Sequence, residues 1–333
     1  MAPSPSLKSI LTQLFPPKPS FTGRGIPDLS DKVYIVTGAN TGTGKELTRM
    51  LYTNNAKVYL LARSEEKTSA AIADIQQAVP NSSGSLRFIR LDLADLSTIK
   101  QTVQNFLALE TKLHVLFNNA GVLSGAKEVA VTAQGYELHT GVNGLGTFLL
   151  SQLLTPILVE TAKSEPPCTV RVVWTASSAA EVFAEEKIGV RPETLSLEAQ
   201  GARYGFQRYW FSKVANWAHA TEYARRHQAD GVVSVSLNPG NLQSDLYRDM
   251  GWFFKILEKL AMYPPVNGAY TELFAGLSPE VNIDNTGCWV IPFGRAYPIR
   301  EDMVLATRTK AEGGTGGNLR FWEWSEAQVA PYL

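Results

Sequence analysis

Residues 33–44 read Val-Tyr-Ile-Val-Thr-Gly-Ala-Asn-Thr-Gly-Thr-Gly, a short apolar run followed by a glycine-rich segment. A β-branched run of this length is typical of a buried strand, and the residues after it are typical of a helix. Glycines at such a junction let the backbone turn sharply and approach a phosphate, which the free N–H groups of the helix can bind. The spacing, Gly38-x-x-x-Gly42-x-Gly44, differs from the common G-x-G-x-x-G, so an ordinary tight turn is an alternative at this point.

Beyond this junction, short apolar runs alternate with helical stretches, the pattern of βαβ units in a parallel sheet. The expected strands are 33–36, 57–61, 86–91, 115–117, 169–174, 232–237 and 288–291. The expected helices are 44–55, 96–109, 136–161 and 207–228. The sequence predicts an α/β fold: one Rossmann-type, doubly wound domain over residues 32–333 with a seven-stranded, mainly parallel sheet. Two stretches that break the alternation, about 179–206 and 241–267, are predicted to be substrate-loop insertions.

The overall composition limits the partners of the chain. Its 333 residues include 31 Lys plus Arg and 31 Asp plus Glu, so no net field attracts nucleic acid or an anionic membrane. The two cysteines, Cys168 and Cys288, are too few for a disulfide framework and lack zinc-ligand spacing. We therefore expect reduced thiols, no metal site and a cytoplasmic protein. No apolar run reaches the ~18 residues of a transmembrane helix, and no secretory signal begins the sequence.

Residues 1–31 form a predicted N-terminal extension rich in Pro, Ser and Gly. Within it, Ser6 to Phe15 is predicted to be a short amphipathic helix that ends before Pro16 and Pro17. Four apolar residues recur in it at helical spacing: Leu7, Ile10, Leu11 and Leu14. Two interpretations are open. The helix packs on the protein's own surface or on a partner subunit, or it makes peripheral contact with a membrane.

The end of the second expected strand indicates which dinucleotide the glycine-rich turn would bind. A site for NAD usually places an acidic residue there to hold the ribose hydroxyls. This chain has Leu60-Leu61-Ala62-Arg63-Ser64, and the Arg63 guanidinium can pair with a 2′-phosphate through charge-assisted hydrogen bonds. The hypothesis is therefore NADP(H), with a solvated Arg63 at a strand end as the alternative. Asp92, after the third strand, is placed to bond an adenine amino group or to form a turn.

A second pattern, Tyr209-Trp-Phe-Ser-Lys213, lies in an expected helix, where residues four apart share one face. The reference pKa of tyrosine is about 10, and a nearby ammonium lowers it towards neutrality. Tyr209 can then act as proton donor and acceptor in carbonyl and alcohol chemistry. By itself the pattern also fits two residues that face solvent.

Further small and polar residues follow successive strands, at the sheet edge where α/β folds bind ligands. Ser177 and Ser178 follow the fifth strand; Ser177 is preferred for contact with a reacting oxygen, and either can instead cap a helix. Asn118-Asn119-Ala120-Gly121 follows the fourth strand and fits close passage by a cofactor or a plain turn. Asn143, in the next helix, fits a packing role or a water-holding catalytic role. Asn238-Pro239-Gly240 ends the sixth strand.

In order and placement, these motifs resemble those of the short-chain dehydrogenases/reductases, and the likeness covers roughly residues 31 to 245. The resemblance implies a catalytic set of Asn143, Ser177, Tyr209 and Lys213. It implies that the cofactor-binding residues are Gly38, Asn40, Thr41, Gly42, Thr43, Arg63, Asp92, Leu93, Asn119, Ala120, Gly121, Tyr209, Lys213, Pro239, Gly240 and Ser244. The Ala-Asn-Thr-Gly loop, Ala62-Arg63 and the late Phe321-Trp-Glu-Trp324 are similar to the retinol dehydrogenase and WW-domain oxidoreductase branch, which has many fungal members. Thr43 departs from the pattern, because the family usually has Ile or Leu there.

The activity that the resemblance implies is NADP(H)-dependent hydride transfer between nicotinamide and a carbonyl or secondary alcohol. In reduction, Tyr209 would protonate the oxygen and Ser177 would orient it. Lys213 would lower the pKa of Tyr209 and hold the nicotinamide ribose, while Asn143 would fix a water. A homo-oligomer is common in the family.

The predicted insertions are rich in aromatic residues: Phe183, Tyr204, Phe206, Tyr247, Trp252, Phe253, Phe254 and Tyr263. They indicate a bulky apolar or aromatic small-molecule substrate, and packing or a subunit interface is the alternative. A ketone or alcohol of fungal secondary metabolism fits by analogy with the family. Two other functions stay open: a non-redox isomerase or cyclase on the same scaffold, and a cofactor-sensing binding protein.

Overall fold

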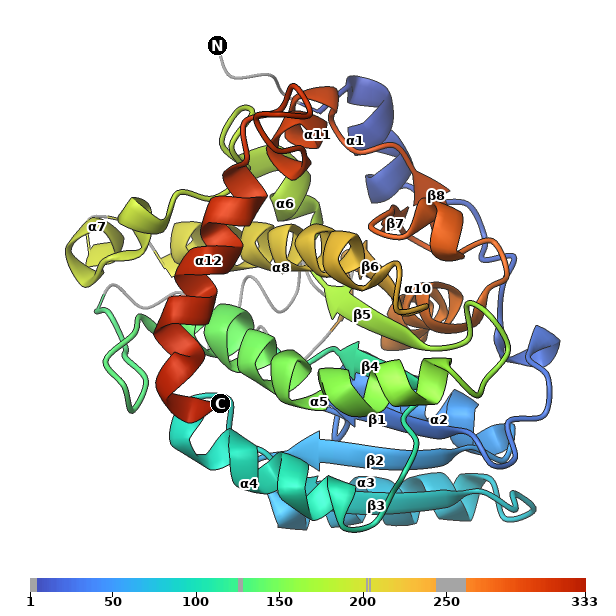
Figure 1. The fold of residues 1–333 in the computed structure, drawn as a ribbon. Coiled ribbons are helices and arrows are strands. Elements are labelled where there is room, and N and C mark those ends of the chain that lie inside the picture. The colour runs from blue at the N-terminus through green and yellow to red at the C-terminus, as the bar shows by residue number, and fades with distance from the viewer. Residues whose placement is uncertain (1–4, 125–127, 202, 204, 244–261) are drawn as a thin grey trace.

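The computed structural model describes residues 5–124, 128–201, 203, 205–243 and 262–333. In this part of the chain, eight strands form one sheet in the order β3-β2-β1-β4-β5-β6-β7-β8. The strands are β1 Val33–Thr37, β2 Lys57–Ala62, β3 Ser85–Arg90, β4 Val115–Asn118, β5 Arg171–Thr175, β6 Val233–Leu237, β7 Trp289–Ile291 and β8 Arg295–Tyr297. The first seven pair in parallel, and β8 pairs antiparallel with β7 at one edge (Figure 1).

This sheet confirms the predicted α/β, doubly wound architecture and has one strand more than the seven expected. Each expected strand is present, and β8 is the addition. Its three residues, Arg295–Tyr297, are partly or fully exposed and pair with β7 across a short turn. A strand this short shows neither an apolar run nor a clear alternation, so the sequence pattern carries no signal for it.

Helices cover both faces of the sheet and enclose a hydrophobic core on each (Figure 1). One face packs against α4 (Leu96–Leu107), α5 (Thr147–Ala162), α8 (Gly205–His227) and α12 (Gly317–Val329). The other packs against α2 (Gly42–Thr53), α3 (Glu65–Ala78) and α10 (Pro265–Leu277). The central strands β1, β4, β5 and β6 are buried along their whole length, as expected for parallel strands covered on both sides.

The order of the sheet reverses between β1 and β4, because the chain runs outward to β3 before it returns to pair with β1. In doubly wound sheets the crevice at this reversal, beyond the carboxyl ends of the strands, is where ligands bind. The glycine-rich junction between β1 and α2 lies at this point. The topology therefore places the predicted site residues at one edge of the sheet.

The stretch predicted as one helix over 136–161 has two parts. It begins as a π-helical segment, Thr140–Gly146, and continues as α5. π-Helical turns are rare and often occur at functional sites, and this one contains Asn143. The combined helix Thr140–Ala162 is long and apolar enough to cross a membrane by length and composition, but 72% of its apolar window is buried inside the fold. It serves here as a core helix against the sheet.

The N-terminal extension carries α1, Leu7–Leu14, whose first turn is capped by Ser6. The helix bonds to α6 (Ser178–Phe183) and to β8 (Figure 1). It packs on the protein through polar residues, which differs from the expectation raised by its apolar spacing. Ser9 and Gln13 are buried, whereas Leu7 is 71% exposed. Leu11 and Leu14 are exposed as well.

The two predicted insertions differ in how much of them the structure describes. The first, 179–206, contains α6, a 3₁₀ turn at Pro192–Leu195 and α7 (Leu197–Gly201). In the second, residues 241–243 and 262–267 are described: Leu242 bridges to Tyr263, and α10 begins. Several predicted residues lie outside the described residues: Tyr204, Ser244, Tyr247, Trp252, Phe253 and Phe254.

Candidate active site

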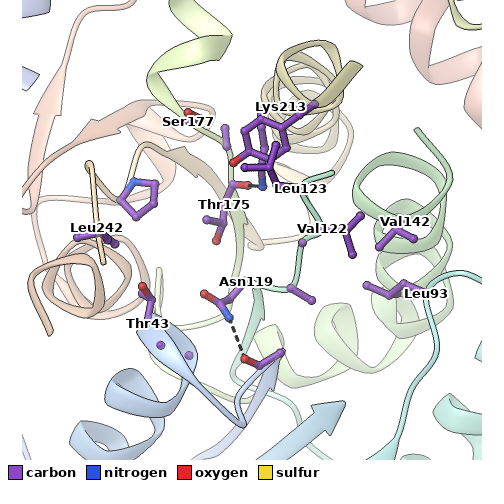
Figure 2. A pocket seen from close by; sticks show the side chains of 18 of the residues that line it. Thr43, Leu93, Asn119, Val122, Leu123, Val142, Thr175, Ser177, Lys213 and Leu242 are labelled. Carbon is purple, nitrogen blue, oxygen red and sulfur yellow. Dashed lines mark hydrogen bonds between the residues drawn. The ribbon is translucent and has the colours of Figure 1, made fainter. Parts of the chain in front are cut away.

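A cleft of about 850 Å³ opens at the carboxyl ends of the parallel strands, where the sheet order reverses. Figure 2 shows Thr43 and Asn119 in the lower part of this cleft and Ser177 and Lys213 in the upper part. The predicted cofactor residues that line it are Gly38, Asn40, Thr41, Gly42, Thr43, Arg63, Asp92, Leu93, Asn119, Ala120, Gly121, Tyr209, Lys213, Pro239 and Gly240. Of the predicted cofactor-binding residues, Ser244 alone lies outside the described residues. The fold thus brings distant motifs to one cavity.

The turn between β1 and α2 has a backbone that favours glycine. Gly38 and Gly42 have φ angles of +65° and +56°, in the left-handed region. A Cβ on Gly44 would lie 2.5 Å from Asn119 Nδ2 and 2.7 Å from the Gly38 carbonyl oxygen. α2 begins at Gly42 with no acidic side chain in its first turn. A glycine-rich turn at the start of a helix, with no acidic side chain beside it, fits a phosphate group.

The segment after β4 is bonded to this glycine turn. Asn119 Nδ2 donates to the Thr37 carbonyl oxygen at 2.8 Å, and the Ala120 N–H donates to Thr37 Oγ1 at 2.9 Å. Thr37 Oγ1 in turn donates to the Phe117 carbonyl oxygen at 3.2 Å. The floor of the cleft is therefore two backbone segments held together, with only small side chains between them.

Two polar residues lie at the end of the cleft formed by β2 and β3. Arg63 is exposed, lines the cleft beside Lys67, and makes no ion pair with any other residue that the structure describes. A guanidinium and an ammonium that line the same cleft fit an anionic group such as a phosphate. Asp92 Oδ1 accepts from the Ala94 N–H at 3.0 Å, so this residue forms a turn and also lines the cleft.

Tyr209 and Lys213 lie one turn apart on α8 and both line the cleft. Lys213 Nζ is 5.6 Å from the centre of the Tyr209 ring and donates to the Thr175 carbonyl oxygen at 2.8 Å. That carbonyl also accepts from Asn216 Nδ2 at 3.0 Å. Burial lowers the pKa of Lys213 to about 8, because a dry environment disfavours the ammonium. The lysine is thus anchored at the end of β5 with its charge beside the tyrosine.

Ser177 is the N-cap of α6, and its Oγ accepts from the Ala179 N–H at 3.3 Å. The hydroxyl keeps its own proton, which it can donate to a bound oxygen in the cleft that it lines. Ser178, the first residue of α6, lines the same cleft. Both serines therefore have access to a ligand, and the cap fixes the backbone of Ser177.

Asn143 lies behind the cleft wall and does not line it. Its side chain is fully buried and bonds to both backbone groups of Val122, donating at 3.0 Å and accepting at 2.8 Å. It also donates to Ser212 Oγ at 2.9 Å, and Ser212 Oγ donates to the Tyr209 carbonyl oxygen at 2.7 Å. Both amide hydrogens are used in these bonds. The Asn143 side chain therefore ties the segment after β4 to the helix turn of Tyr209.

A buried acid that no sequence motif singled out lies behind Lys213. Glu272, on α10, is fully buried, and its Oε1 accepts from Thr175 Oγ1 at 2.6 Å. Its Oε2 has no hydrogen-bond partner among the described residues. Burial raises the pKa of Glu272 to about 7, against the opposing effects of the Thr175 bond and the charge of Lys213. The available signal was a single acid among apolar residues in Tyr270-Thr-Glu-Leu-Phe-Ala275.

Aromatic side chains form one wall of the cleft. Phe183 and Trp210 stack with ring centroids 3.8 Å apart and planes 3° apart. The Phe206 centroid lies 6.5 Å from that of Trp210, and all three residues line the cleft. Trp210 was missed because it lies in the helix that carries Tyr209, outside the aromatic-rich insertions. This wall can contact a flat or bulky apolar molecule.

The chain is similar to known proteins in sequence and in fold. Residues 32–188 match the family model described as short chain dehydrogenase. A short-chain dehydrogenase/reductase of Phomopsis amygdali is 52% identical over 98% of each chain. The short-chain dehydrogenase/reductase bet4 of Neocamarosporium betae is 48% identical over 100% of this chain and 96% of its own. Among solved structures, the Pseudomonas aeruginosa RhlG/NADP active-site complex has a similar fold, with a TM-score of 0.62 and 21% identity over 79% of this chain and 95% of that one.

Replacing Gly44 by alanine is expected to destabilise the protein. The added Cβ would press on Asn119 and on the Gly38 carbonyl, and such overpacking costs about 1–3 kcal/mol of the free energy of unfolding. Urea unfolding measures the change. Gly25→Ala is the control, because nothing lies within 4 Å of a Cβ there. Equal stability of the two variants would contradict the close approach of the two backbone segments.

Glu272→Gln is expected to change the pH dependence of stability. The folded-state pKa of Glu272 is raised from 4.5 to about 7, so its stabilising contribution is complete below pH 4.5 and is lost as the pH rises through 7. This loss amounts to about 3 kcal/mol. Because glutamine does not titrate, the free energy of unfolding of the variant should rise by about that much relative to the unmodified protein between pH 4.5 and pH 8.

Urea unfolding at the two ends of this pH range measures the difference for Glu272→Gln. Glu323→Gln, at an exposed position on α12, is the control and should show no such trend. A constant difference between Glu272→Gln and the unmodified protein would show that folding does not raise the pKa of the Glu272 carboxyl.

Proposed function

The chain belongs to the short-chain dehydrogenase/reductase family, and on that premise we propose that it is an NADP(H)-dependent oxidoreductase acting on a carbonyl or secondary alcohol. The observation that carries the proposal is the shared cleft. A glycine cradle for phosphate, an exposed Arg63, and the Ser177, Tyr209 and Lys213 side chains all line the same cavity. A dinucleotide in the cradle would therefore extend towards the residues that can handle a proton.

The residues of the cleft fit NADP(H) along its length. The turn from Gly38 to Gly42 and the start of α2 would hold the pyrophosphate, and Asp92 would bond the adenine. Arg63, with Lys67 beside it, would pair with the 2′-phosphate, which supports NADP(H) over NAD(H). Pro239-Gly240 would lie against the nicotinamide, and the solved structure from Pseudomonas aeruginosa that shares the fold is described as an NADP complex.

The side chains around Tyr209 supply the proton chemistry. Nicotinamide, when bound, would supply or accept the hydride. In reduction the Tyr209 hydroxyl donates a proton to the substrate oxygen, and in oxidation it takes the proton back. The Lys213 ammonium, 5.6 Å from the ring centre, favours the phenolate that remains. Ser177 donates a hydrogen bond to the same oxygen and orients it.

In this proposal Asn143 has a different role from Ser177, Tyr209 and Lys213, because it does not line the cleft. Its amide is buried and bonded to Val122 and Ser212, so it acts through the position of the Tyr209 turn. We retain Asn143 as a positioning residue of the set, together with Ser177, Tyr209 and Lys213.

The walls near Tyr209 favour an apolar or aromatic substrate. Phe183, Phe206 and Trp210 line this part of the cleft, and Val182 and Leu242 add aliphatic surface. Side chains of this kind bind rings and alkyl chains by exclusion of water. We propose a bulky ketone or alcohol as substrate, of the size and polarity that secondary metabolism produces.

Tyr209→Phe should abolish turnover while it leaves cofactor binding intact. Loss of the proton donor is expected to lower kcat by at least about 100-fold, because general acid catalysis contributes that much. The dissociation constant for NADPH, measured by nicotinamide fluorescence, should stay within about 3-fold, since the ring is kept. Tyr136→Phe removes a hydroxyl that bonds to Gln328 away from the cleft and is the control. A Tyr209→Phe protein with normal turnover of ketones would exclude this mechanism.

Arg63→Ala should weaken the binding of NADPH and spare that of NADH. Charge-assisted hydrogen bonds contribute about 1.5–3 kcal/mol, so the dissociation constant for NADPH should rise by about 10- to 100-fold. Arg90→Ala is the control, because Arg90 is an exposed arginine on the neighbouring strand β3 that does not line the cleft. An equal effect of Arg63→Ala on both dinucleotides would remove the basis for NADP(H) preference.

A further inference from the structure

Four polar side chains from three distant parts of the chain are buried together between α1 and the cleft. Ser9 and Gln13 come from α1, Glu181 comes from α6, and Asn238 follows β6. Their exposed fractions are 2%, 6%, 2% and 4%. Polar groups removed from water to this degree require hydrogen-bond partners, and a carboxylate requires several. We call this group the α1 polar cluster.

The bonds within the α1 polar cluster form a continuous chain. The Glu181 carboxylate accepts from Ser9 Oγ at 2.9 and 3.1 Å and from Gln13 Nε2 at 2.7 Å. Gln13 Oε1 accepts from Asn238 Nδ2 at 2.9 Å. Asn238 Oδ1 then accepts from the Gly240 N–H at 3.1 Å. The chain therefore runs from α6 through α1 to the turn after β6.

Gln13 connects the two halves of this chain of hydrogen bonds. Its NH₂ group donates to Glu181 and its carbonyl oxygen accepts from Asn238, so only a side chain with both functions satisfies the two neighbours. The two ends of the chain are parts of the cleft itself. Gly240 lines the cleft, and α6 begins directly after Ser177.

A second, smaller cavity shows that α1 lies against the cleft. It measures about 150 Å³ and is lined on one side by Ile10, Gln13 and Leu14 of α1. Four residues line both this cavity and the main cleft: Ser178, Val182, Asn238 and Asn241. α1 is therefore separated from the main cleft by only one layer of residues.

We propose that α1 supports the walls of the active site and that Gln13 is the positioning residue through which it does so. Through Asn238, Gln13 holds the Pro239-Gly240 turn against the cofactor cleft. Through Glu181, it holds the first turn of α6 and with it Ser177. The inference rests on the proposed function where it concerns NADP(H), and α1 with Gln13 precedes the segment matched by the family model.

The experiment compares four full-length variants. Gln13→Leu keeps the approximate size and removes both hydrogen-bonding functions. Gln13→Glu places a second acid against Glu181, and the double variant Gln13→Glu with Glu181→Gln exchanges the two groups and restores one donor between them. Thr12→Ala is the matched control on the same helix, because Thr12 bonds to Arg295 on β8 and not to the α1 polar cluster. Circular dichroism verifies that each variant is folded.

Two readouts follow for each variant. The first is the dissociation constant for NADPH by nicotinamide fluorescence, and the second is hydrogen–deuterium exchange of residues 238–243. Gln13→Leu and Gln13→Glu should raise the dissociation constant by about 10-fold and speed the exchange of the Gly240 amide, because a buried hydrogen-bond chain is broken. The exchanged pair should return both values to within about 3-fold of the unmodified protein, and Thr12→Ala should leave them there.

Unchanged NADPH affinity and unchanged exchange at 238–243 in Gln13→Leu would overturn the inference. Should Gln13→Leu fail to fold, the exchanged pair decides: no recovery relative to Gln13→Glu alone would also overturn it. If the unmodified protein binds neither NADPH nor NADH, the proposed function fails, and the exchange measurement still decides whether Gln13 holds the turn.

Discussion

The rest of the candidate active site depends on the contact between two backbone turns, one after β1 and one after β4. Asn119 bonds to the carbonyl of Thr37, and the absent side chain of Gly44 leaves the room that Asn119 occupies. Because parallel strands end at one edge of the sheet, the segments after β5 and β6 reach the same place. The paired turns thus form a floor of backbone, and the side chains that follow each strand determine the chemistry above it.

A buried charge is the second constraint on the site. Lys213 is held by the Thr175 carbonyl, while the Glu272 carboxyl lies on the other side of Thr175 and bonds to its hydroxyl. A carboxylate in direct contact would cancel much of the field of the ammonium. With a neutral carbonyl as its anchor, Lys213 keeps a field that acts on Tyr209. Burial raises the pKa of Glu272, and the Thr175 hydrogen bond and the charge of Lys213 only partly oppose that effect.

Local sequence pattern predicted the elements that have a strong period of their own. Strands β1, β2, β4, β5 and β7 are mainly apolar, β3 and β6 alternate apolar with polar residues, and the motif residues on α8 are one helical turn apart. The residues that it missed depend on what packs against them. The short strand β8 forms only by pairing with β7. The position of Glu272 beside Thr175 depends on the packing of α10 against β5. The side of α1 that packs on the protein is polar because it bonds to Glu181 and Asn238. The position of Asn143 followed from a motif, but its bonds to Val122 and Ser212 required the fold.

The polar contacts that hold α1 on the protein have a consequence for the order in which the molecule folds. The bonds of α1 to Glu181, Asn238 and Arg295 join residues 168 to 283 positions apart, and loops of that length close at a cost in chain entropy before any bond offsets it. α1 can be seated only after α6, the turn after β6 and the hairpin of β7 and β8 exist. Although α1 precedes the other described helices in the sequence, it is therefore among the last to dock, and a fusion placed before α1 would act on a late step of folding.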